Sequence, residues 1–318
     1  MVRVSSGTAH VLGLNRIKCP VLPTTGYLLV GDTCLRDCGF CPRARSSRSR
    51  IDLLSRVTWP VFPLPEVVER ICDAFAGGSI RRVCLQVTHD VKAWFKGRQV
   101  VAEIKRSCEV PVSVSCTATG LRDIEAWFEN GADRFGLALD AAGEEIFTGT
   151  KAGSWERTLS LLYAAAKKWP GRISTHLIVG LGETEFEMIR ILEDLVTRNI
   201  RVGLFAFTPV KGTRLEDLPP PPLPVYRRVQ AAYYLMSKCG IDPGIFRFDD
   251  RGKLIDFGVS MERLKAFLSD GRAFQTAGCP ACNRPYYNEK PGGTMYNYPR
   301  PLTAEEVQSA IGQLELPC

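Results

Sequence analysis

The sequence predicts an α/β fold, a (β/α)8 or partial TIM-type barrel with extensions at both ends. Short apolar segments alternate with longer amphipathic ones, which is typical of a parallel sheet with crossover helices. The chain of 318 residues also exceeds the roughly 250 residues of one eight-fold barrel. We therefore expect an N-terminal extension (1–24), a barrel (25–278) and a cysteine-containing tail (279–318) packed on the barrel.

The strand-like segments follow one another at intervals that leave room for helices. They are residues 81–88, 111–120, 133–140, 172–182, 201–210 and 244–249. Helix-period stretches lie between them, for example 64–78 and 154–169, and Ser154 is a suitable N-cap for the second. Because the chemistry of such barrels lies at the carboxyl ends of the strands, residues that follow a strand are site candidates.

Two later segments interrupt this pattern. Residues 217–224, DLPPPPLP, hold five prolines and predict a stiff extended connection within the barrel. From residue 279 the sequence becomes rich in turn formers and tyrosines without a period. Such a tail needs an anchor, which Cys279 and Cys282 could supply.

The composition limits the cellular compartment and the kinds of partner that we expect. The first residues lack a signal-peptide core, and no run of about 18 uncharged apolar residues occurs, so we expect a soluble, cytoplasmic protein without a membrane partner. In that reducing compartment the twelve cysteines predict metal ligands, catalytic groups or buried thiols before disulfides. The net charge of +7 favours an anionic partner, an acidic protein or bound phosphate; we expect no nucleic acid.

The stretch GDTCLRDCGFCPRARSS (31–47) places three cysteines on one loop. The spacing Cys34-x3-Cys38-x2-Cys41 brings three thiolates together without a fourth nearby, so an iron–sulfur cube bound here keeps one iron free of protein ligands. Structural zinc usually takes four ligands. A zinc loop or unrelated cysteines remain the alternatives.

This spacing, with Phe40 immediately before the third cysteine, resembles the radical S-adenosylmethionine (SAM) superfamily. The resemblance implies that Cys34, Cys38 and Cys41 bind a 4Fe-4S cluster whose open iron holds SAM. It also implies reductive cleavage of SAM to a 5′-deoxyadenosyl radical, fed by an electron donor such as ferredoxin or flavodoxin.

Further matches follow the order of that superfamily. LIVGLGETE (177–185) has glycines at a strand-to-helix turn, which makes Val179 and Gly180, with Phe40, candidate SAM contacts, and Glu183 a helix-start residue. FTPVKGTRLED (207–217) is similar to the sixth-strand segment of biotin synthase and lipoyl synthase. Asp140 ends LALD, which resembles the fourth-strand segment of biotin synthase and implies a cofactor contact; a helix cap is its alternative.

The same resemblance suggests a second metal site on the strands. Cys84 and Cys116 align with ligands of the sulfur-donating cluster of biotin synthase, Ser174 stands where that enzyme has another cysteine, and Arg247 stands where it has an arginine. The alternative is that the two cysteines are small buried hydrophobes.

The tail pair is the stronger candidate for an auxiliary 4Fe-4S cluster. Cys279 and Cys282 should lie where an eighth strand ends, and Cys19, just before the first strand, would be the third ligand. Cys318, Ser46 and Ser47 are further candidates, and a zinc site tying down the tail is the alternative. Three other cysteines fall on helix-like stretches and are interpreted as packing residues: Cys72, Cys108 and Cys239.

Together these features resemble one component of the two-protein lipoyl synthase system. The resemblance implies sulfur insertion into an unactivated C–H bond of a protein-bound octanoyl chain, at carbon 6 first. The partners would be an octanoylated lipoyl carrier and a second radical SAM component. Biotin-synthase-like sulfur insertion, a mutase without sulfur chemistry, and a metal-stabilised binding module without enzymatic activity are the alternatives.

Overall fold

The computed structural model describes residues 1–290 and 292–317, and a curved eight-stranded sheet forms its centre. The strand order is β5-β1-β2-β6-β7-β8-β9-β10. The strands are β1 (Val2–Val4), β2 (Thr25–Val30), β5 (Val61–Phe62), β6 (Arg82–Val87), β7 (Val112–Ser115), β8 (Arg134–Gly136), β9 (Ile173–Val179) and β10 (Arg201–Ala206). The six from β2 to β10 run parallel, whereas β1 and β5 add an antiparallel edge. The described sheet therefore has two free edges, as in a partial TIM-type barrel.

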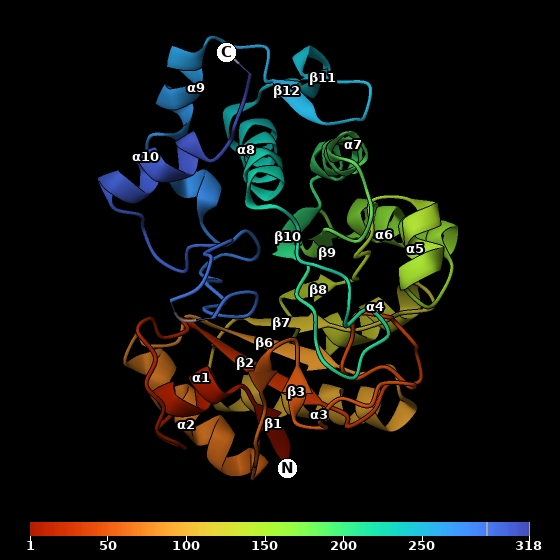
Figure 1. Ribbon diagram of the computed structural model, residues 1–318. Coiled ribbons are helices and arrows are strands. Elements are labelled where there is room, and N and C mark those ends of the chain that lie inside the picture. The colour runs from red at the N-terminus through yellow and green to blue at the C-terminus, as the bar shows by residue number, and fades with distance from the viewer. Residues whose placement is uncertain (291, 318) are drawn as a thin grey trace.

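Most of the helices cover the outside of this sheet, whereas the last two along the chain pack on other helices beyond it (Figure 1). The helices are α1 (Ser6–Val11), α2 (Leu64–Ala76), α3 (Val91–Ser107), α4 (Leu121–Glu129), α5 (Glu144–Thr150), α6 (Trp155–Lys168), α7 (Glu185–Thr197), α8 (Leu223–Cys239), α9 (Met261–Leu268) and α10 (Ala304–Gly312). Ser154 caps α6 as predicted, and Thr184 and Glu187 form a capping box at α7. One extensive apolar core fills the space between helices and sheet.

Two predicted elements differ from the structure. Residues 244–249 do not form a barrel strand: only β11 (Arg247–Phe248) is extended, and it pairs with β12 (Leu254–Asp256) in a separate hairpin. The Asp249 carboxylate accepts backbone hydrogen bonds across that turn and so favours the local pairing. The proline-rich connection ends inside a helix, since α8 begins at Leu223; proline is well tolerated in a first helical turn.

The tail lies along the open side of the barrel, between its first and last parallel strands (Figure 1). Asn283 accepts the N–H of Thr24, just before β2, while Arg284 donates to the carbonyl of Leu204 on β10. Asn288 donates to the carbonyl of Ala206 at the end of β10. The tail thus occupies the place where further strands would close the barrel.

Two other short strands, β3 (Leu53–Leu54) and β4 (Val57–Thr58), form a hairpin beside this opening. Ser55 in its turn donates to the carbonyl of Tyr287 in the tail. Tyr27, Leu29 and Trp59 form a small second apolar cluster there. No helix of the described residues is long and apolar enough to cross a membrane.

Candidate functional site: one cavity between two cysteine groups

A single cavity extends along the inside of the barrel. Its lining includes Ala206, the last residue of β10, and Arg82, the first residue of β6, so it spans the length of the strands. Cys41 lines it from the loop after β2, and Cys279 and Cys282 line it from the tail. The cavity therefore has cysteine thiols at both ends.

The three-cysteine loop follows β2, at the carboxyl end of the parallel strands. Gly31 starts it with a φ of +97° against Thr88, where any side chain would collide. Two backbone hydrogen bonds then fold the loop: Cys34 N–H to the Arg43 carbonyl at 2.9 Å, and Cys41 N–H to the Cys38 carbonyl at 3.1 Å. The loop thereby occupies the end of the barrel at which the sequence predicts the chemistry.

The thiols of this loop are close enough to affect one another. Burial raises the pKa of Cys41 to about 12, and the neighbouring Cys38 and Cys34 add to the shift. Each sulfur also faces a backbone N–H: His89 donates to Cys34 at 3.3 Å, while hydrogen bonds from Ala152 and Arg43 lower the pKa of Cys38 and Cys41. Three adjacent thiols facing amide donors fit the ligand set of an iron–sulfur cluster with one open iron.

Two of the predicted SAM contacts lie at the same end. Phe40 and Asp140 line the cavity beside Cys41. The Asp140 carboxylate forms a buried ion pair with the ammonium group of Lys151 at 2.6 Å. It does not cap a helix, because the N-cap of α5 is Gly143.

The glycine turn after β9 is arranged differently from the prediction. The Val179 side chain is buried in the core, and the cavity is lined by its neighbour Ile178, because successive strand residues face opposite sides. Gly180 donates its N–H to the Glu183 carboxylate at 2.6 Å and adopts a φ of +101°. Glu183 binds the turn amides, and α7 is capped by Thr184 instead.

The tail cysteines lie at the opposite end from the one predicted. Cys279 and Cys282 are near the amino ends of the strands, since Arg82, which opens β6, donates to the carbonyl of Pro280 between them. The prediction placed them at the end of an eighth strand, but the described tail is irregular there. Cys84 on β6 lines the same part of the cavity.

The other predicted ligands are elsewhere. Cys19 donates to the Val21 carbonyl, and Cys116 is buried in the core between sheet and helices. Ser46 and Ser47 belong to the loop at the carboxyl end of the strands. The Ser46 hydroxyl donates to the Asp37 carboxylate, and the Ser47 hydroxyl donates to the Gly212 carbonyl.

The remaining predicted residues that the structure describes do not reach the cavity. Arg247 lies on the hairpin outside the barrel sheet, and its side chain is 76% exposed. Cys318 lies outside the described residues. Cys72, Cys108 and Cys239 pack against the core.

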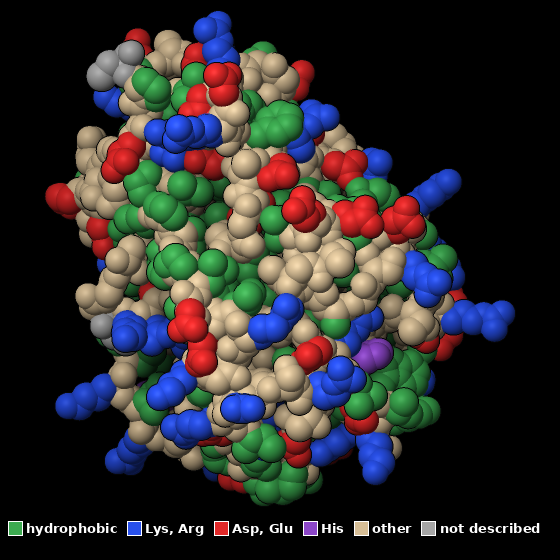
Figure 2. Space-filling view, turned by 45° about the vertical axis from the view of Figure 1, so that its right-hand side comes forward, with side chains coloured by type: hydrophobic (Ala, Val, Ile, Leu, Met, Phe, Trp, Pro, Cys, Tyr) green, Lys and Arg blue, Asp and Glu red, His purple; other side chains and the backbone are tan. Residues whose placement is uncertain are grey.

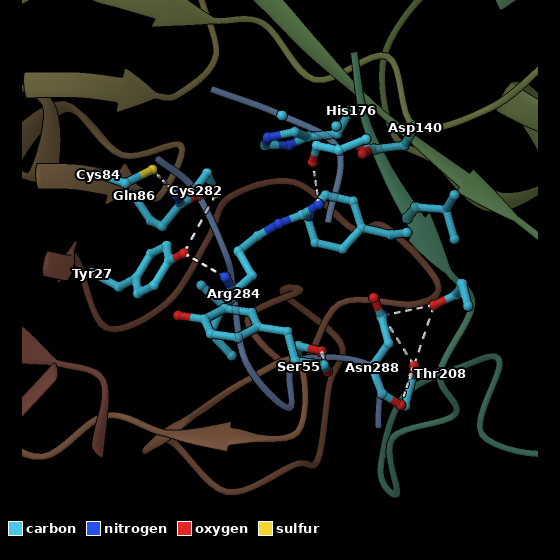
Figure 3. A pocket seen from close by; sticks show the side chains of 18 of the residues that line it. Tyr27, Ser55, Cys84, Gln86, Asp140, His176, Thr208, Cys282, Arg284 and Asn288 are labelled. Atoms are coloured by element: carbon cyan, nitrogen blue, oxygen red, sulfur yellow. Dashed lines mark hydrogen bonds between the residues drawn. The ribbon is translucent and has the colours of Figure 1, made fainter. Parts of the chain in front are cut away.

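Several cavity residues were missed by sequence reasoning (Figure 3). They are Tyr27, Gln86, His176, Arg284 and Asn288. Burial lowers the pKa of His176 to about 4, so its imidazole is neutral near pH 7. His176 could have been found from strand alternation, because it lies two positions from Ser174 and from Ile178, which also line the cavity.

Neither cysteine group forms a single-ion site in the described residues, where no three His, Cys, Asp or Glu side chains converge in that way. A four-iron cluster binds each thiolate through a different iron, so its ligands need not converge on one point.

The fold and this loop define an α/β partial-barrel class with a three-cysteine site at the carboxyl ends of its strands. The profile of the Radical SAM superfamily matches residues 28–195, just over half of the chain. The chain belongs to the radical SAM superfamily. Membership implies a 4Fe-4S cluster and SAM, and the loop cysteines fit such a cluster.

The curated relatives match part of this chain. It is 30% identical over 211 residues to the biotin synthase of Chlamydia pneumoniae, covering 62% of this chain and 60% of the relative. It is 26% identical over 203 residues to the lipoyl synthase of Chlamydia felis, covering 59% of each. The chain thus spans about three fifths of the length of these relatives.

Solved structures show the same fold. Methylornithine synthase (PylB) matches with a TM-score of 0.54 at 16% identity, covering 72% of this chain and 65% of that one. The FeFe-hydrogenase maturase HydG from Carboxydothermus hydrogenoformans matches with a TM-score of 0.52 at 14% identity, covering 67% and 51%. At such identities the likeness shows the fold alone.

Proposed function

We propose that this radical SAM enzyme is a sulfurtransferase that inserts sulfur into an unactivated C–H bond of an octanoyl chain bound to a lipoyl carrier, forming the first C–S bond at carbon 6. The observation that carries the proposal is the continuous cavity with thiols at both ends. Cys41 lies at the end of the cavity where the radical would form. Cys279 and Cys282 lie at the other end, where a sulfur-bearing auxiliary cluster would be held.

The groups that the proposal requires have different roles. When bound, the radical cluster with SAM supplies hydrogen-atom abstraction, and an auxiliary 4Fe-4S cluster supplies sulfide. Cys34, Cys38 and Cys41 would hold the first, and Phe40 and Asp140 would border its SAM. The protein itself would position the acyl chain between the two ends and exclude water.

The lining supports an apolar substrate. Near the carboxyl end it includes the hydrophobic side chains of Phe40, Leu54, Ile178, Phe207 and Val210. Burial of each methylene in such surroundings contributes about 0.8 kcal/mol, so an eight-carbon chain is a substrate this lining can bind. The net charge of +7 supports an acidic carrier, and the lipoyl synthase relatives support the reaction.

The test is a single-turnover assay under anaerobic conditions with SAM, a reductant and an octanoylated lipoyl domain. We expect the acyl chain to gain one sulfur atom by mass spectrometry, and fragmentation to place it at carbon 6. The same domain carrying a hexanoyl chain is the matched control, because carbon 6 would then be its terminal methyl group. SAM cleavage with a rearranged or unchanged acyl chain would instead indicate an enzyme without sulfur chemistry and would refute the proposal.

A further inference from the structure

The base of the cavity brings together three cysteines from distant parts of the chain. Cys84 on β6 lies between Tyr27 on β2 and Ser113 on β7, its register partners in the sheet. The Tyr27 hydroxyl lies 3.4 Å from the sulfur of Cys282, and the Ser113 hydroxyl lies 3.7 Å from the sulfur of Cys279. The two tail sulfurs therefore contact the two neighbours of Cys84, which itself faces the cavity with both of them.

Hydrogen bonds hold the tail in this position. The side chain of Thr24 donates to the Ala281 carbonyl at 2.7 Å, and Arg82 donates to the Pro280 carbonyl at 3.1 Å. Within the tail, the Cys282 N–H donates to the Cys279 carbonyl at 3.0 Å, which forms a tight turn. Both thiols consequently point from one turn into the barrel.

The surroundings of the three thiols are cationic. Arg82, Arg134, Arg201 and Arg284 reach this end of the barrel, and among the described residues none of them forms an ion pair with a carboxylate. Arg82 is 94% buried, being 6% exposed, and its Nε has no hydrogen-bond partner. Arg201 and Arg284 also have buried Nε atoms without a partner.

Buried cations without counter-charges are costly unless an anion is bound beside them. Three thiolates with the sulfides of an iron–sulfur cluster would supply that negative charge. Gln86 already donates to the sulfur of Cys84 at 3.1 Å, as expected of a side chain that stabilises a thiolate (Figure 3).

We propose that Cys84, Cys279 and Cys282 are the protein ligands of an auxiliary iron–sulfur cluster at the amino-terminal base of the barrel. Cys84 thus takes the place expected for Cys19. The role of this cluster as sulfur donor rests on the proposed function, whereas its binding does not. Among the residues that line this end of the cavity there is no fourth thiol, so one iron of such a cluster would have no cysteine ligand.

The experiment uses the full chain in which Cys34, Cys38 and Cys41 are all replaced by alanine, reconstituted anaerobically with iron and sulfide. We expect about four iron atoms per chain to remain, with the spectrum of a 4Fe-4S cluster in Mössbauer spectroscopy. In that background, adding Cys84→Ala, Cys279→Ala or Cys282→Ala should remove most of the remaining iron. Adding Cys19→Ala should leave it unchanged.

Circular dichroism and the thermal midpoint show whether each variant remains folded, and Cys84→Ser gives a second variant of matched size. Full iron retention by folded Cys84→Ala and Cys84→Ser variants would overturn the proposal, as would zinc in place of iron at the site. Normal auxiliary iron in an enzyme that makes no thiolated product would leave the cluster assignment standing and refute the sulfur-insertion function alone.

Discussion

The two ends of the cavity assemble their cysteines in opposite ways. At the carboxyl end, Cys34, Cys38 and Cys41 lie within eight residues, and turn hydrogen bonds inside one loop hold them together. At the base, Cys84 meets Cys279 and Cys282 only because the tail returns across nearly 200 residues of chain to the open side of the barrel. The first group is therefore local in sequence, whereas the second depends on tertiary structure.

The charges at the two ends differ as well. Near the loop, the buried Asp140 is neutralised by Lys151, so the protein supplies both members of the pair. At the base, the arginines have no carboxylate partner among the described residues, and the proposed cluster with its thiolates would supply the compensating charge. One arginine near the loop departs from this contrast: Arg43, close to Cys41, is buried, and two of its guanidinium nitrogens have no hydrogen-bond partner among the described residues.

The largest effect should come from removing the loop thiols. Replacing Cys34, Cys38 and Cys41 together by alanine should reduce reductive SAM cleavage to background, because no other thiols lie at that end of the cavity lining. It should also remove roughly half of the iron if each cysteine group holds one cluster. SAM cleavage measured as 5′-deoxyadenosine checks the first expectation. Cleavage retained by this variant would contradict the assignment of the loop.

This contrast also explains what could be predicted from the sequence. The spacing from Cys34 to Cys41 and the alternation of strands and helices are local patterns, and they predicted the superfamily and the partial barrel, which the profile match and solved structures confirm. The position of the tail is not a local property. Assuming a closed barrel placed Cys279 and Cys282 at the wrong end of the strands, and the same assumption suggested Cys19, whose thiol donates to the Val21 carbonyl, as their third partner.

Side-chain direction was the second source of error. Cys84 and Cys116 both belong to the strand region, but Cys84 faces the cavity whereas Cys116, just beyond the end of β7, packs into the outer core. Alternation along β7 would have favoured Ser113 as the inward residue. The Asp140–Lys151 pair had no sequence signal, because Asp140 precedes α5 and Lys151 follows it, and only the folded chain brings the two side chains together.

The ion pair near the loop gives the next effect. Lys151→Met should lower the free energy of unfolding by about 3–5 kcal/mol, because it leaves the Asp140 carboxylate buried without a counter-charge. Lys168→Met is the matched control: it removes a pair with Glu125 whose side chains are both 42% exposed, and should cost at most about 1 kcal/mol. Guanidinium-induced unfolding of the anaerobic enzyme measures the free energy of unfolding of both variants. Equal losses of stability would show that the buried pair contributes no more than the exposed one.

Exposed basic residues at the mouth of the cavity, the opening at the carboxyl ends of the strands, should have a smaller effect. Replacing them should weaken binding of the carrier domain. Arg45, Arg48 and Lys211 are exposed on two loops joined by the hydrogen bond from the Arg48 N–H to the Gly212 carbonyl. Lys and Arg side chains are also frequent on the lower part of the face in Figure 2, whereas acidic ones gather higher on it. Changing all three to glutamate should weaken binding of an octanoylated acidic lipoyl domain by roughly tenfold, about 1.4 kcal/mol.

The control variant changes Arg81, Arg106 and Lys167 to glutamate. These three residues are exposed near the amino ends of the strands, away from the mouth. The control variant changes the net charge equally and should leave binding nearly unchanged. Raising the salt concentration should weaken wild-type binding, since the Debye length falls from about 10 Å at 0.1 M to about 3 Å at 1 M. Equal loss in both triple variants would indicate a net-charge effect without a docking surface.

The smallest effect should come from cysteines outside both groups. Cys19→Ala in the otherwise unchanged enzyme should leave iron content, SAM cleavage and product yield at wild-type levels, because the Cys19 thiol donates to the Val21 carbonyl at 3.0 Å and does not line the cavity. Cys116→Ala should also retain all its iron but lose about 1 kcal/mol of stability, since its side chain is buried in the outer core. Iron analysis beside denaturant unfolding separates the two effects. A loss of iron from folded Cys19→Ala protein would mean that the N-terminal segment reaches the base site, and Cys84 would then no longer be needed as its third thiol.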